Sequence, residues 1–504
     1  MEKKSSILLN RREFIRQAAC AAVGTAAMTA AIRDLRFMNA AVAQTGINDY
    51  KALVCIFLNG GNDSNNLIIP TITSEYNSYA AIRTPVLAIP QGNVLNLDGL
   101  NAPLNFDGHN YGLHPCCGQL QNLFGQGKLA ILFNTGSLAY PLTKTQYQSY
   151  PSKRPPQLFS HADQVTQWQT SIPDQPPVTG WGGRCADLLD AVQPGAPVSL
   201  SVTLTGANTF EVGNQVSQYS VSTSGAIALS GVSGARLQAL TNILGLAQSN
   251  LQAQAYAGVA KHSINTGTLL NSAIGTTADP SSSVQYWTVP FPGSGVFQVT
   301  TPTSGVKFNS SLGPQLKMIA RLIEAGHRAA ANGGFGMKRQ IFFCQVGGFD
   351  LHSGQTDQPV GGSVLNGAHA NLFAEISQCM NAFQAAMGQI GTVHSDPNFA
   401  NRVTAFTISD FGRTFPGNGQ GSDHGWGSHH LIMGGAVQGK KTYGTFPVLT
   451  VGGPDDVSTG RWIPTTSCDQ YFATLATWFG VDNSNLTTVF PNLGRFASSN
   501  LGFI

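Results

Sequence analysis

The sequence predicts an α/β protein built on a mainly parallel β-sheet, and two observations lead to this prediction. Short runs rich in Val, Ile, Leu and Phe, each followed by Gly, Asn or Ser, are typical of strands buried on both faces: 52–58, 129–133, 340–346 and 403–408. Stretches with helical patterns alternate with them, at about 113–126, 160–170, 311–331, 366–389 and 468–479. The order strand, crossover helix, strand is the pattern of parallel α/β folds.

Before the first strand, the N-terminus has the features of a twin-arginine export signal. The pair Arg11-Arg12 precedes an uncharged run rich in Ala, Thr and Gly, at 17–32, and small residues then converge on an A-x-A site at 41–43. The run is too short and too weakly apolar for a membrane span, which needs about 20 apolar residues. We therefore expect residues 1–43 to be removed and the mature chain to begin at Gln44. An amphipathic helix or an uncleaved membrane anchor are the alternatives.

This interpretation implies export of the folded protein by the twin-arginine translocase, to the periplasm or the cell surface or as a secreted protein. Residues 1–43 hold seven Lys/Arg and three Asp/Glu, which leaves 21 and 22 in the rest of the chain and a formal charge of −1. That balance gives no indication of nucleic-acid binding. Charged residues make up 11% of the whole chain, against about 25% in typical globular proteins. A surface of Ser, Thr, Asn, Gln and Gly suits an extracytoplasmic protein.

The rest of the chain, 44–504, is expected to form one α/β domain with an insertion or cap at about 195–310. The insertion is rich in Ser, Thr, Gly, Ala and Gln, with short alternating pieces near 198–204 and a helix near 235–260. No other segment is long and apolar enough to cross a membrane. Seven cysteines follow the leader and are expected to be buried core residues, although a disulfide stays open.

Polar side chains follow each predicted strand, where the carboxyl ends of parallel strands gather ligands. They are Asp63 after the first strand, Asp350 and His352 after the third, Asp410 and Arg413 after the fourth, His424 shortly beyond, and Ser160 and His161 at the start of a helix. Carboxylates and imidazoles are ligands for Zn²⁺, Mn²⁺, Mg²⁺ or Ca²⁺. A serine at a helix N-terminus beside such a metal is a candidate nucleophile.

Several of these residues have structural explanations as well. Ser160 with Asp163 matches a helix capping box, and Asp63 in a Gly/Asn loop suits a turn. Three roles are compatible with His161: a metal ligand, a substrate contact or a histidine of the core. Two roles are compatible with Arg413: binding a substrate anion or neutralising Asp410.

The motifs Gly-Gly-Asn-Asp, Ser-His, Gly-Gly-Phe-Asp-Leu-His, Ser-Asp-Phe-Gly-Arg-Thr, Asp-His-Gly and Gly-Arg-Trp-Ile-Pro together resemble the exported family called domain of unknown function 1501. The resemblance spans nearly all of residues 50–485 and places the family in the alkaline phosphatase/sulfatase superfamily. It implies an α/β/α sandwich, alkaline phosphatase-like, with a two-metal site at the strand ends.

Carried over to this sequence, the resemblance implies that Asp63 binds one metal and that Asp350 and His352 bind the other. Asp410 stands where the superfamily has an Asp-His pair, but Phe411 replaces the histidine. His424 matches the late histidine of the site and Ser160 the nucleophile.

The expected function is a metal-dependent hydrolase of a phosphate or sulfate ester or a related anionic substrate. Asp63, Asp350, His352, Asp410 and His424 would hold one or two divalent ions, with Ser160, His161 and Arg413 as catalytic residues. The alternative is a non-catalytic exported scaffold that binds a polysaccharide or an envelope partner, which the phenylalanine at a ligand position favours.

Overall fold

The computed structural model describes residues 47–98, 108–176, 178–227, 231–246, 250–275, 297–358 and 360–504. The predicted export signal and its cleavage site lie outside these residues. Within them, no helix combines the length and hydropathy that a membrane span requires. The seven described cysteines are all buried and none forms a disulfide.

The centre of the molecule is a mainly parallel sheet, as the sequence predicts. The four predicted strands are present as β5 (Leu129–Gly136), β12 (Val403–Ser409), β1 (Lys51–Leu58) and β11 (Arg339–Val346). The sheet order is β14 (Thr442–Tyr443), β5, β13 (Ser428–Gly434), β12, β1, β11, β6 (Ser201–Thr203), β7 (Tyr219–Ser222) and β8 (Gly225–Ala226), with β15 (Thr466–Ser467) also paired to β5. Pairing of β1 with β11 and β12 is parallel, and these strands are almost wholly buried, as expected for a sheet covered on both faces.

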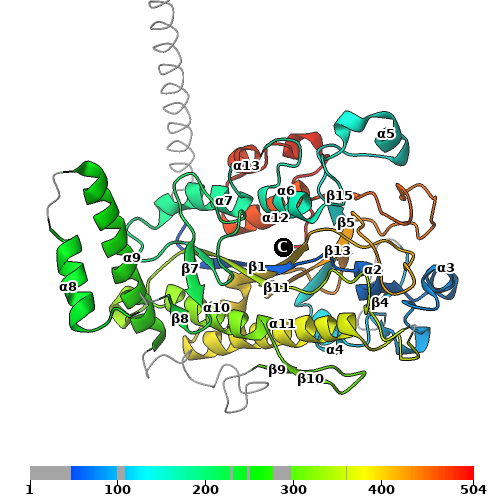
Figure 1. The fold of residues 1–504 in the computed structure, drawn as a ribbon, viewed down its shortest axis with the longest axis horizontal. Coiled ribbons are helices and arrows are strands. Elements are labelled where there is room, and N and C mark those ends of the chain that lie inside the picture. The colour runs from blue at the N-terminus through cyan, green and yellow to red at the C-terminus, as the bar shows by residue number, and fades with distance from the viewer. Residues whose placement is uncertain are drawn as a thin grey trace, which may run out of the picture.

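Helices cover both faces of the sheet and make an α/β/α sandwich (Figure 1). One layer contains α4 (Gly118–Gly125), α10 (Leu312–His327) and α11 (Ala368–Val393). The other contains α6 (His161–Thr170), α7 (Trp181–Leu189), α12 (Cys468–Phe479) and α13 (Leu486–Val489). The helices at 160–170, 311–331, 366–389 and 468–479 are thus confirmed. The helix at 113–126 begins later, because Tyr111–Leu113 forms β4, which pairs with β2 (Ile68–Pro70).

Two features of the sheet differ from the sequence-based prediction. The strand β13 (Ser428–Gly434) was not predicted, and it runs antiparallel between β12 and β5. The Ser/Thr-rich segment is part of the sheet and not only a cover over it. Its strands β6 (Ser201–Thr203) and β7 (Tyr219–Ser222) extend the sheet in parallel from β11. Its helices α8 (Ala235–Leu244) and α9 (Leu251–Gly275) lie at one end of the sandwich (Figure 1).

Candidate metal centre

Three central strands, β1, β11 and β12, have their carboxyl ends side by side at one edge of the sheet. Leu58 at the end of β1 is paired with both Val346 of β11 and Ser409 of β12. The loops that follow therefore leave the sheet side by side and bring Asp350 and Asp410 to one edge. The N-terminus of α6 adds His161 to that edge, and the loop between β12 and β13 adds His424.

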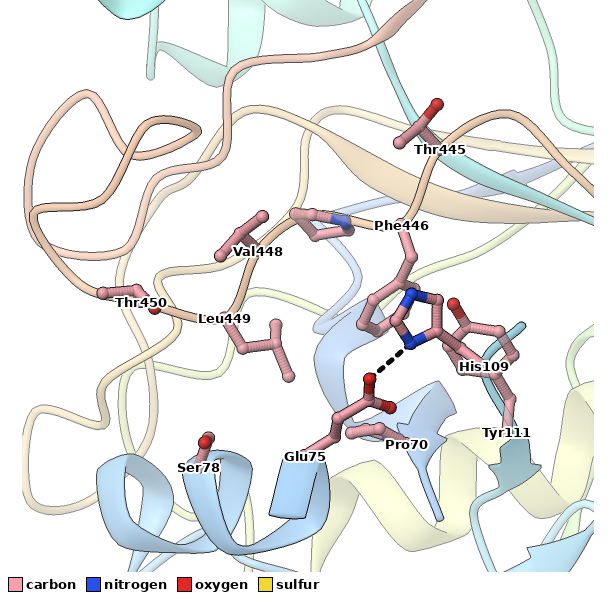
Figure 2. A pocket seen from close by; sticks show the side chains of 11 residues that line it. Pro70, Glu75, Ser78, His109, Tyr111, Thr445, Phe446, Val448, Leu449 and Thr450 are labelled. Atoms are coloured by element: carbon pink, nitrogen blue, oxygen red, sulfur yellow. Dashed lines mark hydrogen bonds and ion pairs between the residues drawn. The ribbon is translucent and has the colours of Figure 1, made fainter. Parts of the chain in front are cut away.

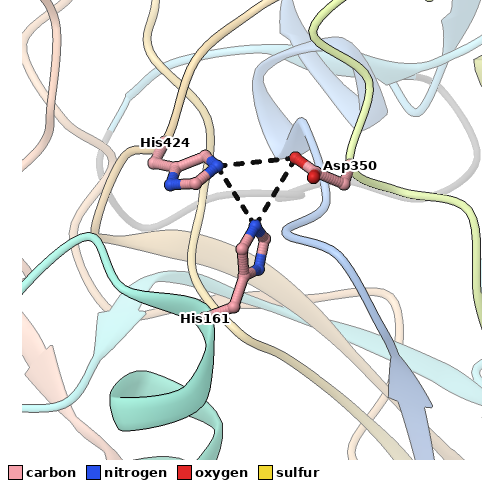
Figure 3. Close-up of side chains that lie close together, drawn as sticks. All are labelled: His161, Asp350 and His424. Carbon is pink, nitrogen blue, oxygen red and sulfur yellow. Dashed lines mark hydrogen bonds and ion pairs between the residues drawn. The ribbon is translucent and has the colours of Figure 1, made fainter.

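His161, Asp350 and His424 converge on a common point above this edge (Figure 3). The two Nε2 atoms of His161 and His424 lie 3.1 Å apart. Each of these atoms lies 3.5 Å from Oδ1 of Asp350. The three potential ligand atoms thus form a nearly equilateral triangle built from three separate segments of the chain.

The size of this triangle fits a metal ion. Two ligands at about 2.0–2.1 Å from a tetrahedral Zn²⁺ are about 3.3 Å apart, close to all three sides of the triangle. Two imidazoles and a carboxylate also leave further coordination positions open, as in catalytic zinc sites and in mononuclear iron sites. The donor set therefore favours a transition metal such as Zn²⁺, Mn²⁺ or Fe²⁺ over Mg²⁺ and Ca²⁺, which prefer oxygen ligands.

The second nitrogen of each imidazole is held by an oxygen acceptor. His161 Nδ1 lies 2.7 Å from Oδ2 of Asp410, and His424 Nδ1 lies 2.8 Å from the carbonyl oxygen of Phe159. An acceptor at Nδ1 keeps the proton there, so that the lone pair of Nε2 faces the centre of the triangle. This is the usual arrangement around metal-binding histidines.

His352 is next to the triangle and repeats the same arrangement. Its Nε2 lies 2.9 Å from Nε2 of His424 and 3.2 Å from Oδ1 of Asp350, while its Nδ1 lies 2.8 Å from Oδ1 of Asp423. It touches two members of the triangle and is not part of the mutually close set. His352 is therefore placed as a fourth ligand or as a polar group beside an open coordination position.

Asp350 remains a carboxylate because of Arg413. Burial raises its pKa, but the hydrogen bond and charge of Arg413, together with His161 and His352, lower the pKa overall. Arg413 Nη1 donates to Oδ1 of Asp350 at 2.8 Å and to the carbonyl of Gly60 at 3.3 Å, and its Nη2 donates to the carbonyl of Ser422. The Arg413 side chain is 0% exposed, so it binds Asp350 from the protein interior and does not face solvent.

His424 remains neutral for a related reason. Partial burial lowers its pKa, and the nearby His161, Arg413 and His352 lower it further, against the opposing effect of the bond to Phe159. A neutral imidazole is the form that binds a metal.

Asp410 lies behind His161, and not beside the triangle. Its side chain is 1% exposed, and its Oδ1 accepts a hydrogen bond from the backbone N–H of Gly60 at 2.9 Å while Oδ2 contacts His161. Both carboxylate oxygens are thus committed to holding neighbouring groups. Phe411 is fully buried, and the centre of its ring lies 4.7 Å from that of His161 and 4.8 Å from that of His424.

Asp63 is not brought into the group. It is buried beside Arg83 of α3 (Thr73–Arg83), with which it forms an ion pair. It also accepts hydrogen bonds from Gln355 at 2.5 Å and from Asn65 at 3.2 Å. Burial raises the pKa of Asp63, but the charge of Arg83 and weaker effects of its other neighbours outweigh burial and lower the pKa overall. The residue implied as a ligand of a second metal therefore has a guanidinium as its counter-charge.

Ser160 is the residue before α6, as the capping pattern predicts, but it does not cap the helix through its side chain. Its hydroxyl instead donates to Oδ2 of Asp163 at 2.6 Å. Within the described residues, no hydrogen bond joins Ser160 to the triangle.

The paired glycines after β1 are required by close packing at the site. Gly60 has φ +117°, and a Cβ there would lie 2.4 Å from the backbone nitrogen of Asp350. Gly61 has φ +84°, and a Cβ there would lie 2.5 Å from the ring of Phe411. The two glycines of Gly-Gly-Asn-Asp thus allow the loop after β1 to pack closely against the loops that carry Asp350 and Phe411.

Three groups of the site were not foreseen from the sequence. Asp423, the carbonyl of Phe159 and Arg461 each contact a histidine of the site or its backbone. Asp423 could have been noticed, because it directly precedes His424. The carbonyl has no signal in the sequence, since any residue provides one. Phe159 has φ +71°, a conformation that non-glycine residues rarely adopt, which is consistent with a functional loop.

Two cavities are relevant to ligands. One, of about 420 Å³, is lined by His352, Asn418, Gly419 and Gln420, and so opens beside the triangle. The other, of about 270 Å³, lies between α3 and the 445–450 loop and shares no lining residue with the triangle. Figure 2 shows that Glu75 and His109 form an ion pair in this second cavity, next to Pro70, Tyr111 and Phe446.

Comparison with known proteins places the chain in a family without assigning its activity. No curated protein matches the sequence. A family model described as "protein of unknown function (DUF1501)" matches residues 50–493, which include every residue of the triangle and its supports. The chain therefore belongs to the DUF1501 family.

Proposed function

We propose that this protein is an exported metal-dependent hydrolase of a phosphate or sulfate ester or a related anionic substrate. One divalent ion would be held by His161, Asp350 and His424, with His352 beside it. The observation that carries the proposal is the triangle of ligand atoms 3.1–3.5 Å apart, with each imidazole fixed by an acceptor at Nδ1. The twin-arginine leader predicted from the sequence supports export of the folded, metal-loaded protein through the translocase.

One metal is favoured over two, because Asp63 already has Arg83 as its partner. When bound, a divalent metal lowers the pKa of a coordinated water and neutralises charge that develops on the substrate. Water is favoured over Ser160 as the nucleophile, because the Ser160 hydroxyl is bonded to Asp163. The cavity beside His352 would admit the substrate next to the open side of the triangle.

The test uses the mature chain from Gln44, purified after export, with its metal content measured before and after chelation. A panel of aryl phosphate and aryl sulfate esters is then assayed with Zn²⁺, Mn²⁺ and Fe²⁺. We expect turnover that disappears on chelation and in Asp350→Asn, and that survives in Ser160→Ala. A protein that holds metal without turning over any ester would refute the hydrolase and favour the binding scaffold. Loss of turnover in Ser160→Ala with metal retained would make Ser160 the nucleophile.

A further inference from the structure

Arg461 contacts His424 and also Phe159, whose carbonyl holds the imidazole of His424. Its Nε donates to the carbonyl oxygen of His424 at 2.7 Å. Its guanidinium carbon lies 4.7 Å from the centre of the Phe159 ring, and the carbonyl of Phe159 is the acceptor for His424 Nδ1. The side chain is partly exposed. Arg461 therefore lies beside the support of His424, on the loop that carries the Gly-Arg-Trp-Ile-Pro motif, to which the proposed chemistry gives no role.

Among the described residues, Arg461 has only neutral hydrogen-bond acceptors. Its side chain donates to the carbonyl of His424, to Oγ1 of Thr459 at 2.9 Å and to Oγ of Ser458 at 3.5 Å, which are all neutral acceptors. In the described part of the chain, no carboxylate lies within ion-pair distance of it. Arg83 and Arg413, by contrast, each pair with an aspartate.

The loop that carries Arg461 is held firmly. Asp456 is fully buried, and its two oxygens accept hydrogen bonds from the backbone nitrogens of Arg461 at 3.0 Å and Gly452 at 2.7 Å. Gly460 has φ +71°, and a Cβ there would lie 2.5 Å from Pro416. An arginine on such a loop loses little freedom on binding a ligand, which favours affinity.

We infer that Arg461 binds an anionic oxygen of the substrate next to the metal, and that the substrate carries a tetrahedral oxyanion, a phosphate or a sulfate. The inference rests on the proposed function, since it places the anion beside the metal that the same triangle would hold. A planar guanidinium is suited to bidentate bonds with such oxygens, and no hydrogen bond from Nη2 of Arg461 to the described residues is present. Arg413 cannot serve in this way, because its side chain is 0% exposed.

The test is the binding of inorganic phosphate and of inorganic sulfate, measured by calorimetry with the metal-loaded mature protein. We expect Arg461→Gln to weaken the binding of the preferred anion about tenfold or more, as for the loss of a charge-assisted hydrogen bond. Arg461→Lys should lose less, because it keeps the charge. Arg236→Gln, which removes an exposed arginine on α8, is the matched control and should bind as wild type.

Metal content is measured in every variant, which separates this inference from the proposed function. Unchanged anion binding in Arg461→Gln with the metal retained would overturn the role of Arg461 alone. Loss of metal in that variant would also overturn it, because Arg461 would then only hold His424. Absence of metal from the wild type would refute the metal centre. In that case, weaker anion binding by metal-free Arg461→Gln than by metal-free wild type would support the role of Arg461, and equal binding would overturn it.

Discussion

Replacing Asp410 by asparagine tests whether this residue orients a ligand or is one. Oδ1 of Asp410 accepts a hydrogen bond from the N–H of Gly60 at 2.9 Å, so the carbonyl oxygen of an asparagine would take that place. The amide NH₂ would then face Nδ1 of His161, at the position where Oδ2 now lies at 2.7 Å. Because an NH₂ group donates, it would make Nδ1 an acceptor and move the imidazole proton to Nε2. The lone pair that faces the triangle would be lost.

The size of the effect follows from this change of tautomer. Loss of an outer acceptor of a metal-bound histidine costs about 10- to 100-fold in metal affinity, and about 100-fold corresponds to about 2.8 kcal/mol. We expect the upper end of that range, because the substitution opposes the required tautomer as well as removing the carboxylate. The fold should survive, because asparagine has nearly the same shape as aspartate.

The assay is a Zn²⁺ titration of the metal-free protein in competition with a chromophoric chelator. Asp396→Asn is the matched control, since Asp396 pairs with Arg402 at 2.9 Å and has no part in the site. Wild-type affinity in Asp410→Asn would refute the account of His161. A folded Asp410→Asn protein as devoid of metal as Asp350→Asn would instead make Asp410 a ligand.

Two further predictions concern buried charged and titratable groups. Arg83→Ala should lower the free energy of unfolding by about 3–5 kcal/mol, because it leaves Asp63 buried without its partner. Arg402→Ala, which breaks a partly exposed pair, should lower the free energy of unfolding by under about 1 kcal/mol. Urea titrations of both variants measure these changes. Loss of metal from a stable Arg83→Ala protein would instead return Asp63 to the ligands. Burial lowers the pKa of His369 to about 4 and those of His429 and His430 to about 3, against 6.5 when exposed. The unfolded chain thus binds more protons below pH 6.5, and the stability of the metal-free protein should fall between pH 6.5 and about 4. Each histidine should contribute about 1.4 kcal/mol per pH unit to this decrease, and a flat profile over this range would contradict the burial of these rings.

Much of the fold could be predicted because buried parallel strands have a clear pattern. The runs that became β1, β5, β11 and β12 are apolar on both faces and end in small or polar residues. The strand β13 was missed because it begins with Ser428, His429 and His430, which give it a polar start. Those histidines are nevertheless buried, since β13 lies inside the sheet.

The site could be predicted only in part, for a physical reason. Strand ends that share a level bring their loops together, so Asp350, His161 and His424 were predicted as site residues from the sequence. Which carboxylates face the common point depends on partners distant in the sequence. Asp63 is paired with Arg83 on α3, and Asp410 is held by Gly60 and His161. No local pattern around either aspartate indicates those partners.

The most direct test of the metal centre is elemental analysis of the exported mature protein beside His161→Ala and His424→Ala. His109→Ala, which removes a histidine with 47% exposure in the separate cavity, is the matched control. We expect about one transition-metal ion per chain in the wild type and the control, and a loss in both site variants. A wild type that takes up no Zn²⁺, Mn²⁺ or Fe²⁺, or site variants that keep the metal, would contradict the assignment of His161, Asp350 and His424.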